Sequence, residues 1–213
     1  MHGLRALDLG CGQGYFTRAL AAAGAQAAGV DFAEELVTYA RAHEARAPLG
    51  AEYHVLSASA IERHLPRGSI DLVTACMSLQ DMADVEATVH AAFAVLAPRG
   101  RMVFSVPHPG TDTPVREWER DAMHRKAALK IDRYFDTGPA VCQWNMPRLL
   151  YSWDTPYWRF TLSEWSALIA RAGFVIQRLH EPRPTEAQVR TNPKLADCYR
   201  LPYCLIFDLV KAP

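Results

Sequence analysis

The chain has 213 residues, of which 50% are hydrophobic, and this length and composition predict one domain with a single core. Its 23 basic and 23 acidic residues balance, so no net field draws it toward nucleic acid or an anionic membrane, and we expect a small, uncharged or mildly charged partner. Five cysteines without a C-x-x-C pair favour free thiols in a reducing cytosol over a disulfide framework.

Signals for targeting, membrane insertion and metal binding do not stand out in the sequence. No signal peptide precedes the first predicted strand, and no apolar run is long enough to cross a bilayer. The eight histidines show no metal-ligand spacing such as H-E-x-x-H. We therefore expect a soluble, cytoplasmic protein that binds no metal, as a monomer or a homodimer.

The first recognisable unit is a glycine-rich turn. Arg5–Leu9 is a short apolar run with one acid, Gly10, Gly12 and Gly14 follow at alternate positions, and an alanine-rich amphipathic pattern covers residues 15–23. This pattern predicts a strand, a tight turn and a helix. Glycines at such a turn allow positive φ angles and close approach of a ligand, and the first N–H groups of the helix favour a carboxylate or phosphate there.

A second strand is predicted over residues 26–30, and it leads into Asp31. An acid at the tip of the second strand is where a βαβ nucleotide site binds ribose hydroxyls, although the same carboxylate could simply cap the next helix. The dinucleotide form G-x-G-x-x-G would need its third glycine at position 15, where this chain has Tyr15. The spacing therefore disfavours an NAD-dependent oxidoreductase.

The middle of the chain continues the alternation of strands and helices. The predicted elements are a helix over residues 33–46, strands over 52–56 and Ile70–Cys76, a helix over 85–96 and a strand over 101–106. Apolar residues at helical spacing give the helix over 85–96 one buried face, and Asp84 is its expected N-cap. Strands joined by helices in this way are typical of a parallel α/β sheet.

A long segment, residues 108–159, separates these elements from the next predicted core element. It is rich in aromatic residues, which argues against disorder, and connections this long inside a domain are usually functional. Residues 115–129 within it are predicted to form a mostly charged helix.

The C-terminal part returns to regular elements. Thr161 and Glu164 form a capping box that opens another helix, and strands follow over Phe174–His180 and residues 203–210.

Seven stretches follow the motif order of one protein family: residues 8–14, 29–32, 68–73, 95–101, 105–109, 157–163 and 172–174. Together they resemble the class I S-adenosylmethionine-dependent methyltransferases. The first two are similar to the cofactor-binding motifs of that family, and the fourth is similar to the turn before its fifth strand. One departure is Arg99, which stands where the family usually has glycine.

The resemblance implies an α/β, Rossmann-like fold: a seven-stranded, mostly parallel sheet with the last strand antiparallel, helices on both faces and a lid insertion after strand five. It implies one methyltransferase domain over residues 1–213. Because the carboxyl ends of parallel strands share the edge where open α/β folds bind ligands, the resemblance suggests two lids over one cofactor site, residues 108–159 and 182–202. Relatives usually carry a few dozen residues before the first strand, so this chain is expected to be a short or shortened form.

The resemblance also implies the cofactor, S-adenosyl-L-methionine, which becomes S-adenosyl-L-homocysteine, and the positions that bind it. The glycines would bring backbone amides to the methionine carboxylate, with Asp8 orienting the loop or the ammonium group. The family's usual acid near the adenine is absent, so backbone contacts at Ser59 and Ala60 are expected instead. The predicted cofactor-binding residues are Asp8, Gly10, Gly12, Gly14, Asp31, Phe32, Ser59, Ala60 and Cys76.

The acceptor is expected near Ser78 and Gln80, which follow the fourth strand, where the family places groups close to the reactive methyl. Trp158 and Arg159 are further candidates, because relatives often show Y-H-R at this position and this chain has Trp158 in place of the histidine. That replacement removes a titratable group and adds a flat apolar face.

Two residues are candidates for the general base. Asp81 could accept a proton from the acceptor, or it could simply fix the turn before the next helix. His108 titrates near neutrality when unperturbed, but a histidine between two prolines could equally be a lid hinge.

The sequence as a whole predicts methyl transfer from S-adenosylmethionine to an oxygen, nitrogen or carbon nucleophile of a small, flat or apolar molecule. The alternative is a catalytically silent, methyltransferase-like subunit that binds the cofactor or a partner chain.

Overall fold

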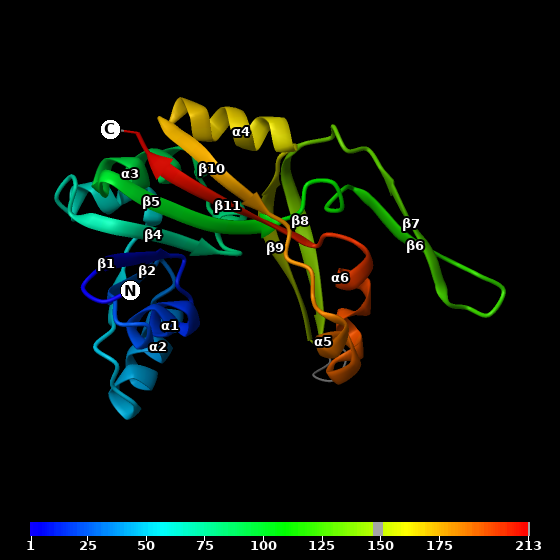
Figure 1. Cartoon of the computed structure of the whole chain (residues 1–213), viewed down its shortest axis with the longest axis horizontal. Coiled ribbons are helices and arrows are strands. Elements are labelled where there is room, and N and C mark those ends of the chain that lie inside the picture. The colour runs from blue at the N-terminus through cyan, green and yellow to red at the C-terminus, as the bar shows by residue number, and fades with distance from the viewer. Residues whose placement is uncertain (147–150, 213) are drawn as a thin grey trace. The chain divides into compact units, whose positions relative to one another are not determined.

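A computed structural model describes residues 1–146 and 151–212, and these form two compact units (Figure 1). The first unit comprises Met1–Val106, Ser166–Leu179 and the C-terminal residues from Ile206. The second comprises Pro107–Trp165 and His180–Leu205, and therefore contains both predicted lid segments. The expectation of a single domain with two lids stays a prediction.

The first unit is built on a seven-stranded sheet in the order β10-β11-β5-β4-β1-β2-β3. The pairs β1–β2, β1–β4, β2–β3 and β4–β5 are parallel, whereas β11 runs antiparallel, as its arrow in Figure 1 shows. The strands are β1 (Arg5–Leu9), β2 (Gln26–Asp31), β3 (Glu52–Val55), β4 (Ile70–Cys76), β5 (Leu96–Pro107), β10 (Phe174–His180) and β11 (Cys204–Lys211). This confirms the predicted sheet and its antiparallel last strand.

Helices cover both faces of this sheet. In Figure 1, α1 and α2 lie on one side and α3 and α4 on the other. The helices are α1 (Tyr15–Ala22), α2 (Glu34–Arg46), α3 (Val85–Val95) and α4 (Leu162–Arg171), with short 3-10 helices η1 (Ala58–Arg63) and η2 (Leu79–Asp81). Among residues 1–146 and 151–212, no helix combines the length and the apolar character needed to cross a bilayer.

The central strands are apolar because helices cover both faces. Leu7 of β1, Val73 of β4 and Phe104 of β5 are fully buried. The Phe104 ring stacks on Phe207 of β11 with the ring centroids 4.8 Å apart. Full burial of each such side chain contributes about 1.5–3 kcal/mol. This packing fixes the register of the strands, and the register fixes where each strand ends.

Both predicted helix caps are confirmed. The Asp84 Oδ1 atom accepts a hydrogen bond from the Ala87 N–H at 2.8 Å, which starts α3. At the start of α4, the Thr161 Oγ1 atom accepts from the Glu164 N–H at 3.1 Å, and the Glu164 carboxylate accepts from the Thr161 N–H at 2.7 Å. These contacts satisfy amide groups that the helices leave unpaired at their N-termini.

Arg99 has a left-handed backbone, with φ of 62°, in the turn within β5. The pairing of β4 with β5 skips from Leu96 to Arg101, so the intervening residues bulge out of the ladder. A Cβ atom on Gly100 would lie 2.8 Å from the Ala97 carbonyl oxygen, so position 100 requires glycine. The left-handed backbone at position 99 explains why the family usually has glycine there, and Arg99 carries strain in its place.

The second unit consists of two hairpins and a short helical segment. Its elements are β6 (Val115–Arg120), β7 (Lys126–Asp132), β8 (Gly138–Met146), β9 (Tyr151–Arg159), α5 (Glu186–Thr191), η4 (Pro193–Leu195) and α6 (Ala196–Arg200). Strands β6 and β7 pair with each other, and so do β8 and β9, in both cases antiparallel.

The predicted helix over residues 115–129 is wrong, because β6 and β7 form a hairpin there. Asp121 closes its turn by accepting hydrogen bonds from the N–H groups of Met123 and Arg125 at 2.9 and 3.0 Å. Trp118 faces Leu129 across the two strands. This turn and the cross-strand pairing outweigh helix propensity, which differs by at most about 0.7 kcal/mol among ordinary residues.

Candidate functional site

The glycine turn after β1 has one open position. Gly10, Gly12 and Gly14 all have positive φ angles, of 64°, 53° and 81°. A Cβ atom on Gly10 would lie 2.6 Å from the Ser78 Cβ atom, and one on Gly14 would lie 2.6 Å from the Tyr53 hydroxyl oxygen. Within the described residues, and apart from its own chain neighbours, no atom lies within 4 Å of the place that a Cβ atom on Gly12 would take. The first and third glycines thus allow the protein to pack against itself, while Gly12 leaves room for a ligand.

Asp8 is held inside the sheet beneath this turn. It is 1% exposed, and its two carboxylate oxygens accept hydrogen bonds from the Thr17 and Thr74 hydroxyls at 2.7 and 2.9 Å. Burial raises the pKa of Asp8 to about 6, because the cost of desolvating the charge outweighs the two hydrogen bonds that favour it. In this arrangement Asp8 ties β1, α1 and β4 together.

Asp31 joins the glycine turn to the end of β2. One carboxylate oxygen accepts from the Gly12 N–H at 2.8 Å and the other accepts from the Ala33 N–H at 2.9 Å. The N-cap residue of α2 is Ala33, so Asp31 precedes the cap position. An ionised carboxylate has about four acceptor sites, so both oxygens can still accept from ligand hydroxyls.

Large apolar side chains are exposed beyond the carboxyl ends of the parallel strands. Tyr15 follows the turn after β1 and is 86% exposed, and Phe32 follows β2 and is 80% exposed. Val55 at the end of β3 and Met77 after β4 are also exposed. Exposed apolar groups gathered at one edge mark a ligand surface more often than scattered ones do. The exposure of Phe32 leaves its ring available to a ligand, and its predicted place beside the adenine stays a prediction.

The remaining predicted cofactor positions lie at the ends of β3 and β4. The Ser59 hydroxyl lies 2.9 Å from that of Ser57, and the next residue, Ala60, is half-buried in η1. Cys76 is exposed at the end of β4, with its Sγ atom 3.8 Å from the Ser105 hydroxyl. Sheet order places β4 beside β1, whereas β3 is the edge strand beyond β2.

The loop after β4 carries the predicted acceptor residues of the first unit. The Ser78 hydroxyl donates to the Leu9 carbonyl at 2.7 Å, which fastens this loop to the end of β1. Gln80 is buried, and its Nε2 atom donates to the Met77 carbonyl at 2.9 Å and to an Asp81 carboxylate oxygen at 3.1 Å. Gln80 thus orients the Asp81 carboxyl.

Asp81 has the properties of a general base. The residue as a whole is exposed, yet partial burial of its carboxyl raises its pKa to about 6, and the hydrogen bond from Gln80 only partly opposes this shift. Its carboxylate is therefore mostly ionised at neutral pH and can accept a proton.

His108 has no free ring nitrogen. Its Nδ1 atom accepts from the Gly110 N–H at 3.1 Å, which assigns the proton to Nε2, and Nε2 lies 2.9 Å from a Glu181 carboxylate oxygen. Both nitrogens are therefore engaged within the second unit, and this favours Asp81 over His108 as the base.

Trp158 and Arg159 lie near the end of β9, also in the second unit. The Trp158 ring stacks near Phe160, with centroids 6.4 Å apart. The Arg159 guanidinium lies 5.2 Å from the centroid of the buried Tyr157 ring. The structure thus groups these two residues with His108 in one unit, and the other predicted site residues in the other.

Nothing in the sequence pattern indicated Thr17 and Thr74 as partners of Asp8. The signal that could have found them is the acid itself, because a carboxylate inside an apolar strand needs buried donors. Which hydroxyls supply them depends on the alignment of β1 with β4, which only the fold defines.

Comparisons with known proteins agree on one family. A model of the methyltransferase domain matches residues 7–104. The crystal structure of an S-adenosylmethionine-dependent methyltransferase from Mesorhizobium loti is 31% identical, with a TM-score of 0.81, over 98% of this chain and 91% of that one. A putative S-adenosylmethionine-dependent methyltransferase from Listeria monocytogenes shares the fold, with a TM-score of 0.80, 24% identity, and coverage of 100% of this chain and 91% of that one.

Among curated proteins, the ubiquinone biosynthesis O-methyltransferase of Xanthomonas euvesicatoria pv. vesicatoria is 36% identical over 103 residues. That of Methylococcus capsulatus is 38% identical over 103 residues. In both cases the match spans 48% of this chain and 43% of the relative, so the chain matches less than half the length of these curated relatives.

Proposed function

The chain belongs to the class I S-adenosylmethionine-dependent methyltransferases, and we propose that it transfers the methyl group of this cofactor to a hydroxyl oxygen of a small, flat or apolar molecule. The proposal rests on three features that lie at one edge of the sheet. There the open turn at Gly12 follows β1, the anchored carboxylate of Asp31 ends β2, and the Asp81 carboxyl follows β4.

The residues at this edge fit the cofactor. Gly12 leaves open space where any other residue would place a Cβ atom, and Asp31 retains acceptor capacity for the two ribose hydroxyls. The exposed face of Phe32 suits the adenine, and the exposed ring of Tyr15 suits a sulfonium by cation–π attraction. When bound, S-adenosylmethionine supplies a methyl group that is already activated, so the protein contributes alignment and exclusion of water.

Oxygen is the acceptor atom that the site supports best. An un-ionised hydroxyl must lose its proton as the new bond forms, and Asp81, with a pKa of about 6, can take that proton at neutral pH. With S-adenosylmethionine held at Gly12 and Asp31, the acceptor oxygen would take the methyl group and the sulfur would keep the electrons of the carbon–sulfur bond, while Asp81 takes the proton. The curated relatives named as O-methyltransferases support the same choice.

The role of the two predicted lids is part of this proposal. The chain enters the second unit at Pro107, the last residue of β5, and again after Leu179 of β10. That unit contains the aromatic residues that would suit a flat acceptor, Trp158 among them. The assignment of residues 108–159 and 182–202 as lids stays a prediction, which the Trp158 variant in the Discussion addresses.

The test measures binding and turnover separately. We expect calorimetry to detect S-adenosylhomocysteine binding, and labelled S-adenosylmethionine to methylate phenols and catechols in preference to matched anilines. Asp81→Asn should cut methyl transfer by at least about a hundredfold at unchanged S-adenosylhomocysteine affinity, whereas His108→Gln should retain most of it. Wild-type activity should fall as the pH falls through about 6, because Asp81 becomes protonated.

Three outcomes would contradict the proposal. Cofactor binding without transfer to any member of the panel would support the catalytically silent subunit instead. Preference for anilines would exclude oxygen as the acceptor atom. Full activity in Asp81→Asn would remove Asp81 as the base.

A further inference from the structure

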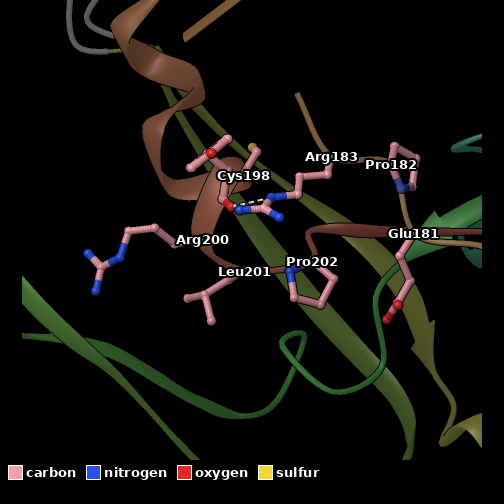
Figure 2. Close-up of a pocket in the computed structure, with 8 residues that line it drawn as sticks. Glu181, Pro182, Arg183, Cys198, Arg200, Leu201 and Pro202 are labelled. Carbon is pink, nitrogen blue, oxygen red and sulfur yellow. Dashed lines mark hydrogen bonds between the residues drawn. The ribbon is translucent and has the colours of Figure 1, made fainter. Parts of the chain in front are cut away.

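The second unit contains a cavity that the proposed methyl transfer does not use. Two segments line it, residues 181–183 after β10 and residues 198–202 at the end of α6 (Figure 2). Its volume is about 610 Å³, within the range of about 300–1,000 Å³ that is typical of small-molecule sites. Pro182, Leu201 and Pro202 give it apolar walls.

Arg183 is held in place at this cavity by two contacts with one residue. Its Nε atom donates to the Tyr199 carbonyl at 2.9 Å, and its guanidinium carbon lies 4.2 Å from the centroid of the Tyr199 ring. In the part of the chain that the structure describes, the two terminal nitrogens of Arg183 have no hydrogen-bond acceptor. The guanidinium is therefore oriented in advance, and its outer edge, with two parallel donors, is free.

The other charged groups at the cavity are already engaged. The terminal nitrogens of Arg200 donate to the carbonyls of Lys126 and Ala127 at 2.8 and 2.6 Å. One Glu181 carboxylate oxygen lies 2.9 Å from the His108 Nε2 atom. In Figure 2 the Glu181 side chain also points away from the Arg183 guanidinium. Two arginines and one glutamate leave the lining with a positive charge, and Arg183 holds its unused donors.

We propose that this cavity binds a small carboxylic acid. The ligand carboxylate accepts two parallel hydrogen bonds from the terminal nitrogens of Arg183, and its apolar body packs against Pro182, Leu201 and Pro202. Arginine presents a planar fork that matches a carboxylate, so the site discriminates an acid from its amide. The site is built from the second unit alone, and it stands whether or not the proposed methyl transfer is correct.

Calorimetry with the whole 213-residue chain tests this site, with benzoate and its neutral counterpart benzamide as probes at constant ionic strength. We expect benzoate to bind at least about tenfold more tightly than benzamide, since charge-assisted hydrogen bonds are the stronger kind. Arg183→Met should abolish this preference, and Arg183→Lys should keep only part of it, because lysine keeps the charge but loses the fork. The matched control is Arg178→Met on β10, which removes the same charge from an exposed position outside the cavity and should keep the full preference.

Equal binding of benzoate and benzamide by the wild-type chain would overturn the proposal, and this comparison needs no variant. Loss of the preference in Arg178→Met to the same extent as in Arg183→Met would also overturn it, because net charge rather than a built site would then explain binding. If Arg183→Met shows no cooperative thermal melt, the folded Arg183→Lys variant is used instead. A full preference for benzoate over benzamide in that variant would contradict recognition by the planar guanidinium.

Discussion

Replacing Asp8 with asparagine should remove a pH dependence of stability that this buried carboxyl creates. Burial raises the pKa of Asp8 from 3.8 to about 6 although Thr17 and Thr74 donate to its ionised form. Because the pKa is higher in the folded state, the folded protein binds the proton more tightly than the unfolded chain does. Proton binding by Asp8 therefore stabilises the folded state fully below about pH 4, and this stabilisation is lost as the pH rises through about 6.

The magnitude follows from the size of the shift. About two pKa units at about 1.36 kcal/mol each give about 3 kcal/mol in the free energy of unfolding. Between about pH 4.5 and about pH 7.5 the folded carboxyl passes from mostly protonated to ionised, which covers about 2 kcal/mol of that total.

Urea unfolding of the wild-type and Asp8→Asn proteins across this pH range measures the effect. The difference between the two free energies isolates Asp8, since the other titrating groups are common to both. We expect the wild-type protein to lose about 2 kcal/mol relative to the variant as the pH rises from about 4.5 to about 7.5.

Asp71→Asn is the matched control, because the pKa of Asp71 is lowered in the folded state and its effect on stability has the opposite dependence on pH. The Arg5 side chain donates to Asp71 and holds the pKa of that carboxyl below its usual value. Relative to Asp71→Asn, the wild-type protein should therefore gain stability as the pH rises through the acidic range. A wild-type minus Asp8→Asn difference that stays constant with pH would refute the reasoning about burial.

Three further predictions concern the turn, the strained residue and the second unit. Gly12→Ala should abolish S-adenosylhomocysteine binding in a folded protein, because its Cβ atom would occupy space left for the ligand. Gly14→Ala should mainly lower the melting temperature, because its Cβ atom would meet Tyr53. Retained binding in Gly12→Ala would show that the ligand lies elsewhere. Arg99→Gly should raise the free energy of unfolding by about 0.5–1 kcal/mol, since relief of a left-handed backbone exceeds the entropy cost of glycine, and urea unfolding should reveal no gain if the turn is unstrained. Trp158→Ala, once its folding is checked by thermal melt, should reduce methyl transfer while leaving S-adenosylhomocysteine affinity nearly intact; equal losses of cofactor and acceptor affinity would mean that residues 108–159 are a general structural cover.

Local patterns in the sequence were sufficient for the first half of the fold. The run Arg5–Leu9, the alternating glycines and the acid at position 31 each act over a few residues, and the structure has the predicted strand, turn and helix there. The same holds for Asp84 and for Thr161 with Glu164, because a helix cap joins a side chain to an amide three residues away.

The pattern was misleading in the long connection after β5. Charged residues there resemble an exposed helix, but the turn at Asp121 and the pairing of Trp118 with Leu129 produce a hairpin. Strand pairing joins residues that are distant along the chain, and neither composition nor helical spacing reports it.

The sequence by itself determined the family, the order along the chain of the seven strands of the main sheet, and the place of the glycine turn, because each is written in short motifs whose residues are close together in the chain. Only the tertiary structure decided how the charged groups are used. Asp8 became a buried anchor because β4 brings Thr74 to it, and His108 lost its free nitrogens because Glu181, from another segment, meets its ring. Tyr199 holds the Nε atom and one face of the Arg183 guanidinium, and among the described residues no acceptor meets its two terminal nitrogens. Desolvation and hydrogen bonding between distant segments set the protonation and the availability of a side chain, and these are properties of its surroundings in space.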